Sequence, residues 1–70
     1  MTENTSNSPE LKQGMLYSKE EIDVNQLILR NETSYFKIYL KHKMLYFFDK
    51  APVMDAGKEK YILTTIMNQE

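Results

Sequence analysis

The chain has 70 residues, a formal net charge of −1 and no cysteine, so it holds at most one domain and neither a disulfide nor a thiolate zinc site. Six acids and three bases occur in residues 1–32, against four acids and six bases in residues 33–70. This excess of bases is too small for the strongly basic footprint of a nucleic-acid-binding domain. A folded chain of this size buries only about 60% of its unfolded surface, so we expect a second copy or another protein to stabilise it.

Residues 1–12 are polar and carry no apolar repeat. They predict a disordered tail, because such a segment buries too little surface to offset the entropy lost on ordering. The N-terminus lacks the basic start and apolar run of a signal peptide, and no apolar stretch approaches the roughly 18 residues of a membrane span. We therefore expect a soluble cytoplasmic protein with one small β-rich domain over residues 13–67 and a frayed end at 68–70.

A short apolar stretch at residues 14–17 predicts an edge strand. The next segment, residues 18–30, fits two patterns. Ser18 followed three residues later by Glu21 is typical of a capping box and predicts a helix that begins directly after the serine. The apolar residues of the same segment also alternate as they do in a strand. We expect a short helix or helical turn, followed by extended chain around residues 27–29.

The central hairpin has the strongest pattern in the chain. Alternation over residues 34–40 separates two sets of side chains, with Phe36, Ile38 and Leu40 on one face and Tyr35, Lys37 and Tyr39 on the other. Residues 44–48 are apolar on both faces, which is typical of a strand that is central or covered. The connection at residues 41–43 has neither an Asn-Gly pair nor a glycine, so we expect a loop longer than two residues.

Residues 49–60 are predicted to be a loop, because Pro52 and Gly57 interrupt them. Residues 61–67 are rich in β-branched side chains and predict a further strand. The predicted fold class is therefore mainly β: a small antiparallel sheet or partial barrel of three to five strands, with a short helix or helical turn before the central hairpin.

The sequence offers little for catalysis. His42 is the only histidine and lies between two lysines in a predicted turn, whereas a catalytic base is normally oriented by a third group. Glu20 and Glu21 are placed where acids favour the first turn of a helix. We expect no catalytic residue, no metal, no cofactor and no enzymatic activity.

The apolar strand and its aromatic neighbours favour a protein–protein surface, because aromatic residues and methionine are enriched at interfaces. The expected function is a non-catalytic protein-binding or regulatory module that acts by homo-oligomerisation or by docking on a partner protein. Buried aromatic anchors usually carry most of the binding energy. The residues expected to bind the partner are Tyr35, Tyr39, Met44, Tyr46 and Phe48.

An alternative is that the hairpin over residues 35–46 binds nucleic acid or an anionic surface. Its tyrosines would stack on bases, and its lysines would contact phosphates. The residues expected to bind the anion are Lys37, Lys41 and Lys43. This alternative is less favoured, because the hairpin has no arginine, the cation that stacks best on aromatic rings.

The segments LKQGMLYSK, SYFKIYLKHKMLYFFDK and KYILTTI together resemble the opening half of a pleckstrin homology domain. The residues that match the family pattern are Gly14, Leu16, Tyr35, Phe36, Leu45, Tyr46 and Phe47. The resemblance covers residues 11–66 and implies half of a split domain, which would require a partner. Thr33 and Ser34 stand where phosphoinositide-binding members carry basic residues, so the resemblance does not imply phosphoinositide binding.

Overall fold

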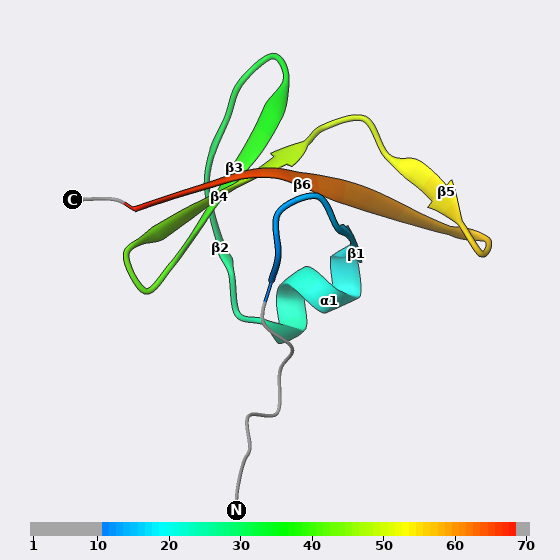
Figure 1. The fold of residues 1–70 in the computed structure, drawn as a ribbon, viewed down its shortest axis with the longest axis horizontal. Coiled ribbons are helices and arrows are strands. Elements are labelled where there is room, and N and C mark those ends of the chain that lie inside the picture. Colours follow the sequence, from blue (N-terminus) through cyan, green and yellow to red (C-terminus); the bar gives the residue numbers. More distant parts are fainter. Residues whose placement is uncertain (1–10, 69–70) are drawn as a thin grey trace, which may run out of the picture.

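A computed structural model describes residues 11–68, and these form one short helix and a six-stranded antiparallel sheet (Figure 1). The mainly β class is confirmed. Residues 1–10 of the predicted tail and residues 69–70 of the predicted frayed end lie outside the described residues. The elements in chain order are β1 (Leu16–Ser18), α1 (Lys19–Val24), β2 (Ile28–Glu32), β3 (Phe36–Lys41), β4 (Met44–Asp49), β5 (Val53–Asp55) and β6 (Lys58–Asn68).

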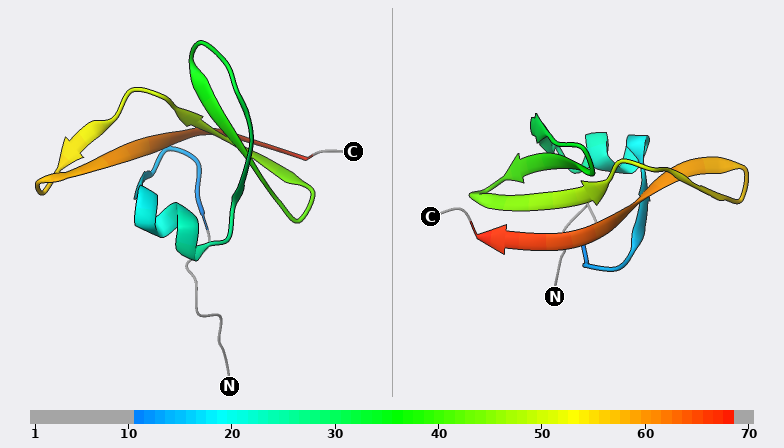
Figure 2. Two further views of the ribbon diagram at one scale, coloured as in Figure 1. Left: turned by 180° about the vertical axis from the view of Figure 1, so that it is seen from behind. Right: turned by 90° about the horizontal axis from the view of Figure 1, so that it is seen from above.

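The strands lie in the order β1-β6-β4-β3-β2, and β5 pairs with the first residues of β6. β6 is the longest strand and connects the two parts of the sheet, because its first half pairs with β1 and β5 and its second half with β4. The right panel of Figure 2 shows β3, β4 and β6 side by side. The sheet is open, since β1 and β2 end it and do not pair with each other.

Helix α1 begins where the capping box predicts. The hydroxyl Oγ of Ser18 accepts the backbone N–H of Glu21 at 3.2 Å, and the Glu21 carboxylate accepts the backbone N–H of Ser18 at 2.8 Å. The helix ends at Val24 with Asn25 as its C-cap, and the next residue, Gln26, has a left-handed φ of 63°. The N–H of Gln26 then donates to the carbonyl of Asp23, which turns the chain toward β2.

The turn between β3 and β4 contains only two residues, His42 and Lys43, with φ of 53° and 64°. The expectation of a longer loop was wrong. Two left-handed residues give the twist that suits a tight hairpin, and six consecutive cross-strand pairs hold the two strands together despite the unfavourable turn residues. Ala56 and Gly57 make a similar turn between β5 and β6, inside the segment that the sequence predicts to be a loop.

The core lies between one face of the sheet and helix α1 with the segment that precedes β1. Its buried apolar residues are Leu11, Tyr17, Ile22, Leu27, Phe48 and Leu63. Leu11 and Lys12, which the sequence places in the tail, therefore belong to the fold. The backbone N–H of Lys12 also donates to the Tyr17 hydroxyl at 2.8 Å. This face of the sheet is called the inner face below.

A candidate protein-binding face

The opposite face of the sheet, called the outer face below, has an apolar surface. The cross-strand register joins its side chains into rows across four strands, because residues directly opposite each other in neighbouring strands point to the same side. One row is Ile28, Leu40, Leu45 and Met67, and the next is Asn31, Ile38, Phe47 and Thr65. Phe36 extends the face beyond the second row, so that seven apolar side chains share it.

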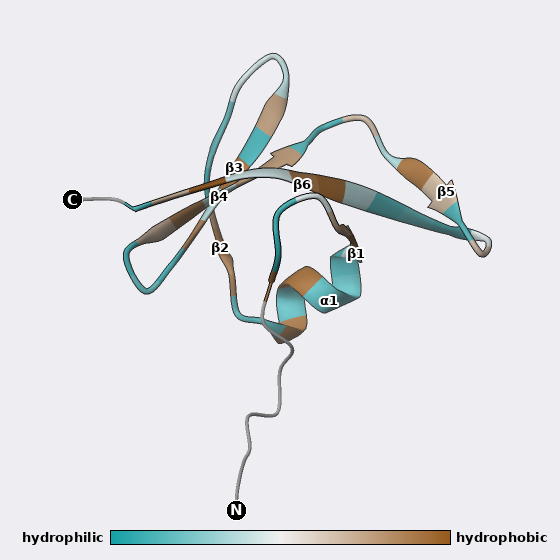
Figure 3. Ribbon diagram, in the orientation of Figure 1, coloured by the Kyte–Doolittle hydropathy of each residue, from teal (hydrophilic) through white to brown (hydrophobic). Residues whose placement is uncertain are grey.

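No described helix covers the outer face: α1 and the segment before β1 lie on the other side of the strands (Figure 1). Ile28 and Met67, at the two sides of the face, are 68% and 50% exposed. The other five apolar residues of the face are half-buried. Figure 3 shows hydrophobic stretches along β3, β4 and β6. The outer face is therefore accessible and apolar.

Aromatic contacts fix side chains on the outer face. The rings of Phe36 and Phe47 lie 6.0 Å apart at 84°, an edge-to-face arrangement. Phe47 also lies opposite Ile38 on β3. Such ring pairs contribute about 0.5–1.5 kcal/mol beyond the area they bury. A partner would thus meet a preorganised surface, which lowers the entropic cost of binding.

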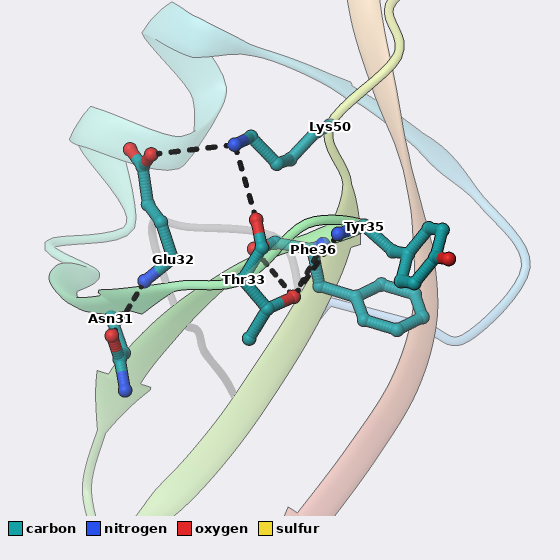
Figure 4. A network of polar contacts seen from close by, with 6 residues as sticks. All are labelled: Asn31, Glu32, Thr33, Tyr35, Phe36 and Lys50. Carbon is teal, nitrogen blue, oxygen red and sulfur yellow. Dashed lines mark hydrogen bonds and ion pairs between the residues drawn. The ribbon is translucent and has the colours of Figure 1, made fainter.

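A polar network holds one end of this face in place (Figure 4). The hydroxyl of Thr33 accepts the backbone N–H groups of Tyr35 and Phe36 at 3.2 and 3.0 Å. The ammonium of Lys50 donates to the Thr33 carbonyl at 3.1 Å and lies 3.7 Å from the Glu32 carboxylate. The network links the β2–β3 connection to the end of β4 and so orients Phe36.

Three of the five residues expected to bind a partner belong to the core or pack against it on the inner face. Phe48 is 0% exposed, at the centre of the core. The ring of Tyr39 packs edge-on against it at 5.5 Å and 86°, and Tyr46, opposite Tyr39, also packs against the core. Burial raises the pKa of the Tyr39 hydroxyl above its usual range, and the negative charge of Asp23 adds to this effect. Phe48 therefore belongs to the core, and the half-buried Tyr39 and Tyr46 pack against it.

The other two expected residues lie apart from each other. Tyr35 is 74% exposed in the β2–β3 connection, and its ring contacts that of Phe36 at one end of the outer face. Met44 begins β4 at the opposite end, pairs with Lys41 and Asn68, and by alternation with Tyr46 lies on the inner side of the strand. The expected surface is therefore not continuous. Alternation in the hairpin correctly separated the two sets of side chains, but the set on the face away from α1 is the one with Phe36 and Ile38.

The structure does not gather the three lysines of the alternative site with the tyrosines into one surface. Lys37 points to the inner face, where its ammonium lies 5.0 Å from the centre of the Tyr61 ring. Lys41 and Lys43 lie at the β3–β4 turn, at the far end of β3 from Tyr35. A stacking platform needs aromatic rings and cations along one groove, and these residues are divided between two faces and two ends of the sheet.

Among residues 11–68, no group of three or more histidine and acidic side chains is placed to hold a metal ion. Nor is any helix within that range long and apolar enough to cross a membrane. No family model matches the chain, and no curated protein or solved structure is significantly similar to it. The resemblance to the opening half of a pleckstrin homology domain therefore stays a prediction.

Proposed function

We propose that this chain is a non-catalytic protein-binding module that acts through the outer face of its sheet. The observation that carries the proposal is the set of seven apolar side chains on a face that no described element covers. An exposed apolar patch of a few hundred Å² commonly marks an interaction site in a small protein. The open surface of the sheet suits a protein partner better than a small ligand, which is usually bound in a concave pocket.

The small core supports the same proposal. Only Phe48 and Leu63 are large side chains with essentially no exposed surface in the described part of the chain. A core of this size stabilises a domain weakly. Covering the outer face would bury Ile38, Leu40, Leu45 and Phe47 completely, and burying apolar surface contributes about 25 cal/mol per Å². Association would therefore stabilise the fold as well as serve the function.

A site-specific photo-crosslinker tests the proposal. Benzoylphenylalanine in place of Phe47 would project from the outer face, and the same group in place of Val24 would project from α1 on the other side of the sheet. Val24 is 64% exposed and is therefore the matched apolar control. Irradiation in the cells that make the chain should join the first variant, and not the second, to a protein whose mass is read by mass spectrometry. Equal labelling at both positions, or none at the Phe47 position, contradicts the proposal.

A further inference from the structure

The charged side chains around the outer face are separated by sign. Its two central rows contain no ionisable side chain. Lys43 lies at one end, in the β3–β4 turn, and Asp49 lies at the other end of β4, opposite Phe36. The five residue steps of β4 separate the two ends by about 17 Å. The face is therefore an apolar centre with a basic end and an acidic end.

These charges have no partners of opposite sign within the described residues. Neither Lys43 nor Asp49 takes part in an ion pair there. One oxygen of Asp49 accepts the backbone N–H of Ala51 at 3.0 Å, and its second oxygen has no such bond. Lys50, the base nearest to this end, is held by Glu32 and by the Thr33 carbonyl. The acidic end thus keeps its negative charge.

We infer that the partner is a second copy of this chain, packed outer face to outer face with its strands antiparallel to those of the first. This inference rests on the proposed function of the face. A two-fold axis perpendicular to the strands places the apolar rows on each other and the basic turn of each copy over Asp49 of the other. An axis parallel to the strands would place basic turn on basic turn, and like charges in contact disfavour a complex. The charges on the face thus select one orientation.

The size of the face determines how tight this dimer is. Four strands about 4.8 Å apart and six residues at about 3.3 Å each give a face of about 400 Å² in projection. Two such faces give about 800 Å² of buried surface, less than the roughly 1,200 Å² of a stable specific complex, so association is weak and reversible. Two sheets packed at a small angle with interlocking side chains follow the ordinary geometry of a β-sandwich. We expect a dissociation constant of roughly micromolar size.

Charge reversal tests the orientation. Sedimentation velocity of the purified full chain, across a wide dilution range and at low salt, should show a monomer–dimer equilibrium. Lys43→Asp alone and Asp49→Lys alone should each weaken the dimer roughly tenfold, because each change removes two opposite-charge contacts and creates two like-charge contacts per dimer. The variant with both changes should regain most of the wild-type affinity. An equimolar mixture of the two single variants should form a heterodimer, since one chain then carries two acids and the other two bases. Circular dichroism of every variant confirms that the fold is kept.

The outcomes separate this inference from the proposed function. A chain that stays monomeric at all concentrations overturns the inference, as does a dimer that neither the double change nor the mixture restores. The photo-crosslinking experiment at the Phe47 position then tests the proposed function independently. A crosslinked product of twice the chain mass supports both proposals. A product with a different protein supports the binding face alone and overturns the second copy as its partner.

Discussion

Phe47 and Phe48 are neighbours in β4, yet their rings lie on opposite faces of the sheet and in different environments. The Phe48 ring is completely buried between the rings of Tyr17 and Tyr39, with centroid distances of 6.3 and 5.5 Å. The Phe47 ring is half-buried on the outer face against Phe36. Phe48 therefore contributes to the stability of the fold, whereas Phe47 belongs to the face that is proposed to bind a partner.

Replacing each ring by alanine should give clearly different results. Phe48→Ala removes a fully buried ring, which typically costs about 3–5 kcal/mol. This is comparable with the whole free energy of unfolding of a domain of this size, about 3–9 kcal/mol, so we expect the variant to be largely unfolded. Phe47→Ala should cost about 1–2 kcal/mol, because the ring is already partly in contact with water.

Urea denaturation followed by circular dichroism measures both costs. The protein concentration should be well below micromolar, so that dimer dissociation does not add to the cost. In sedimentation experiments at higher concentration, Phe47→Ala should remain folded and lose self-association. If Phe47→Ala destabilises the monomer as much as Phe48→Ala does, the outer face is packed rather than exposed.

The alternation of side chains in β3 could be predicted from the sequence, but the face that the fold covers could not. Phe36, Ile38 and Leu40 form the more apolar set, whereas Tyr39 and Lys37 lie on the face that packs against the core. Periodicity says only that two faces exist. Which face is covered depends on where α1 and Leu11 pack, and those contacts join residues far apart in the sequence.

The half-buried Tyr39 hydroxyl should make the fold sensitive to alkaline pH. Burial raises its pKa in the folded state, with a smaller contribution from Asp23. In the unfolded chain the pKa is about 10. A group whose pKa is raised on folding contributes fully below the unfolded value, and this contribution is lost as the pH rises through the folded value. The fold should therefore lose stability above about pH 10.

Tyr39→Phe keeps the ring contact with Phe48 and removes the titrating group. Urea denaturation between pH 8 and pH 11 should show a smaller loss of stability in this variant than in the wild type. Tyr35→Phe changes an exposed ring and is the matched control, which should follow the wild type. Identical pH profiles for Tyr39→Phe and the wild type would show that burial of the hydroxyl does not contribute.

The capping box of α1 should contribute measurably to the stability of this small domain. Ser18→Ala removes the acceptor for the Glu21 N–H and should cost about 1 kcal/mol. Glu21→Gln keeps an oxygen that can accept the Ser18 N–H, so it should cost clearly less. The midpoint of urea denaturation at pH 7 measures both variants. A loss for Glu21→Gln as large as that for Ser18→Ala would contradict this expectation and would show that the negative charge of Glu21 is needed as much as the Ser18 hydroxyl.

The helix start was predictable because the capping box is a local signal, with partners three residues apart. The tight hairpin turn was not, because His42 and Lys43 are poor residues for it. The six cross-strand pairs from Phe36↔Asp49 to Lys41↔Met44 impose the turn on these residues. The interaction of whole strands outweighs a local preference of about 1–2 kcal/mol per residue. The turn therefore retains strain that a substitution can remove.

Lys43→Gly should stabilise the chain by about 1 kcal/mol, because glycine adopts the φ of 64° without a clash of its side chain. Ser34→Gly is the matched control: Ser34 is an exposed residue of the β2–β3 connection outside the left-handed region, where glycine only adds flexibility to the unfolded chain. Thermal and urea denaturation at submicromolar concentration should show a gain for the first variant and a small loss for the second. If Lys43→Gly gains nothing while the hairpin is retained, the left-handed backbone at Lys43 is relieved by neighbouring contacts, and the strain lies at His42 instead.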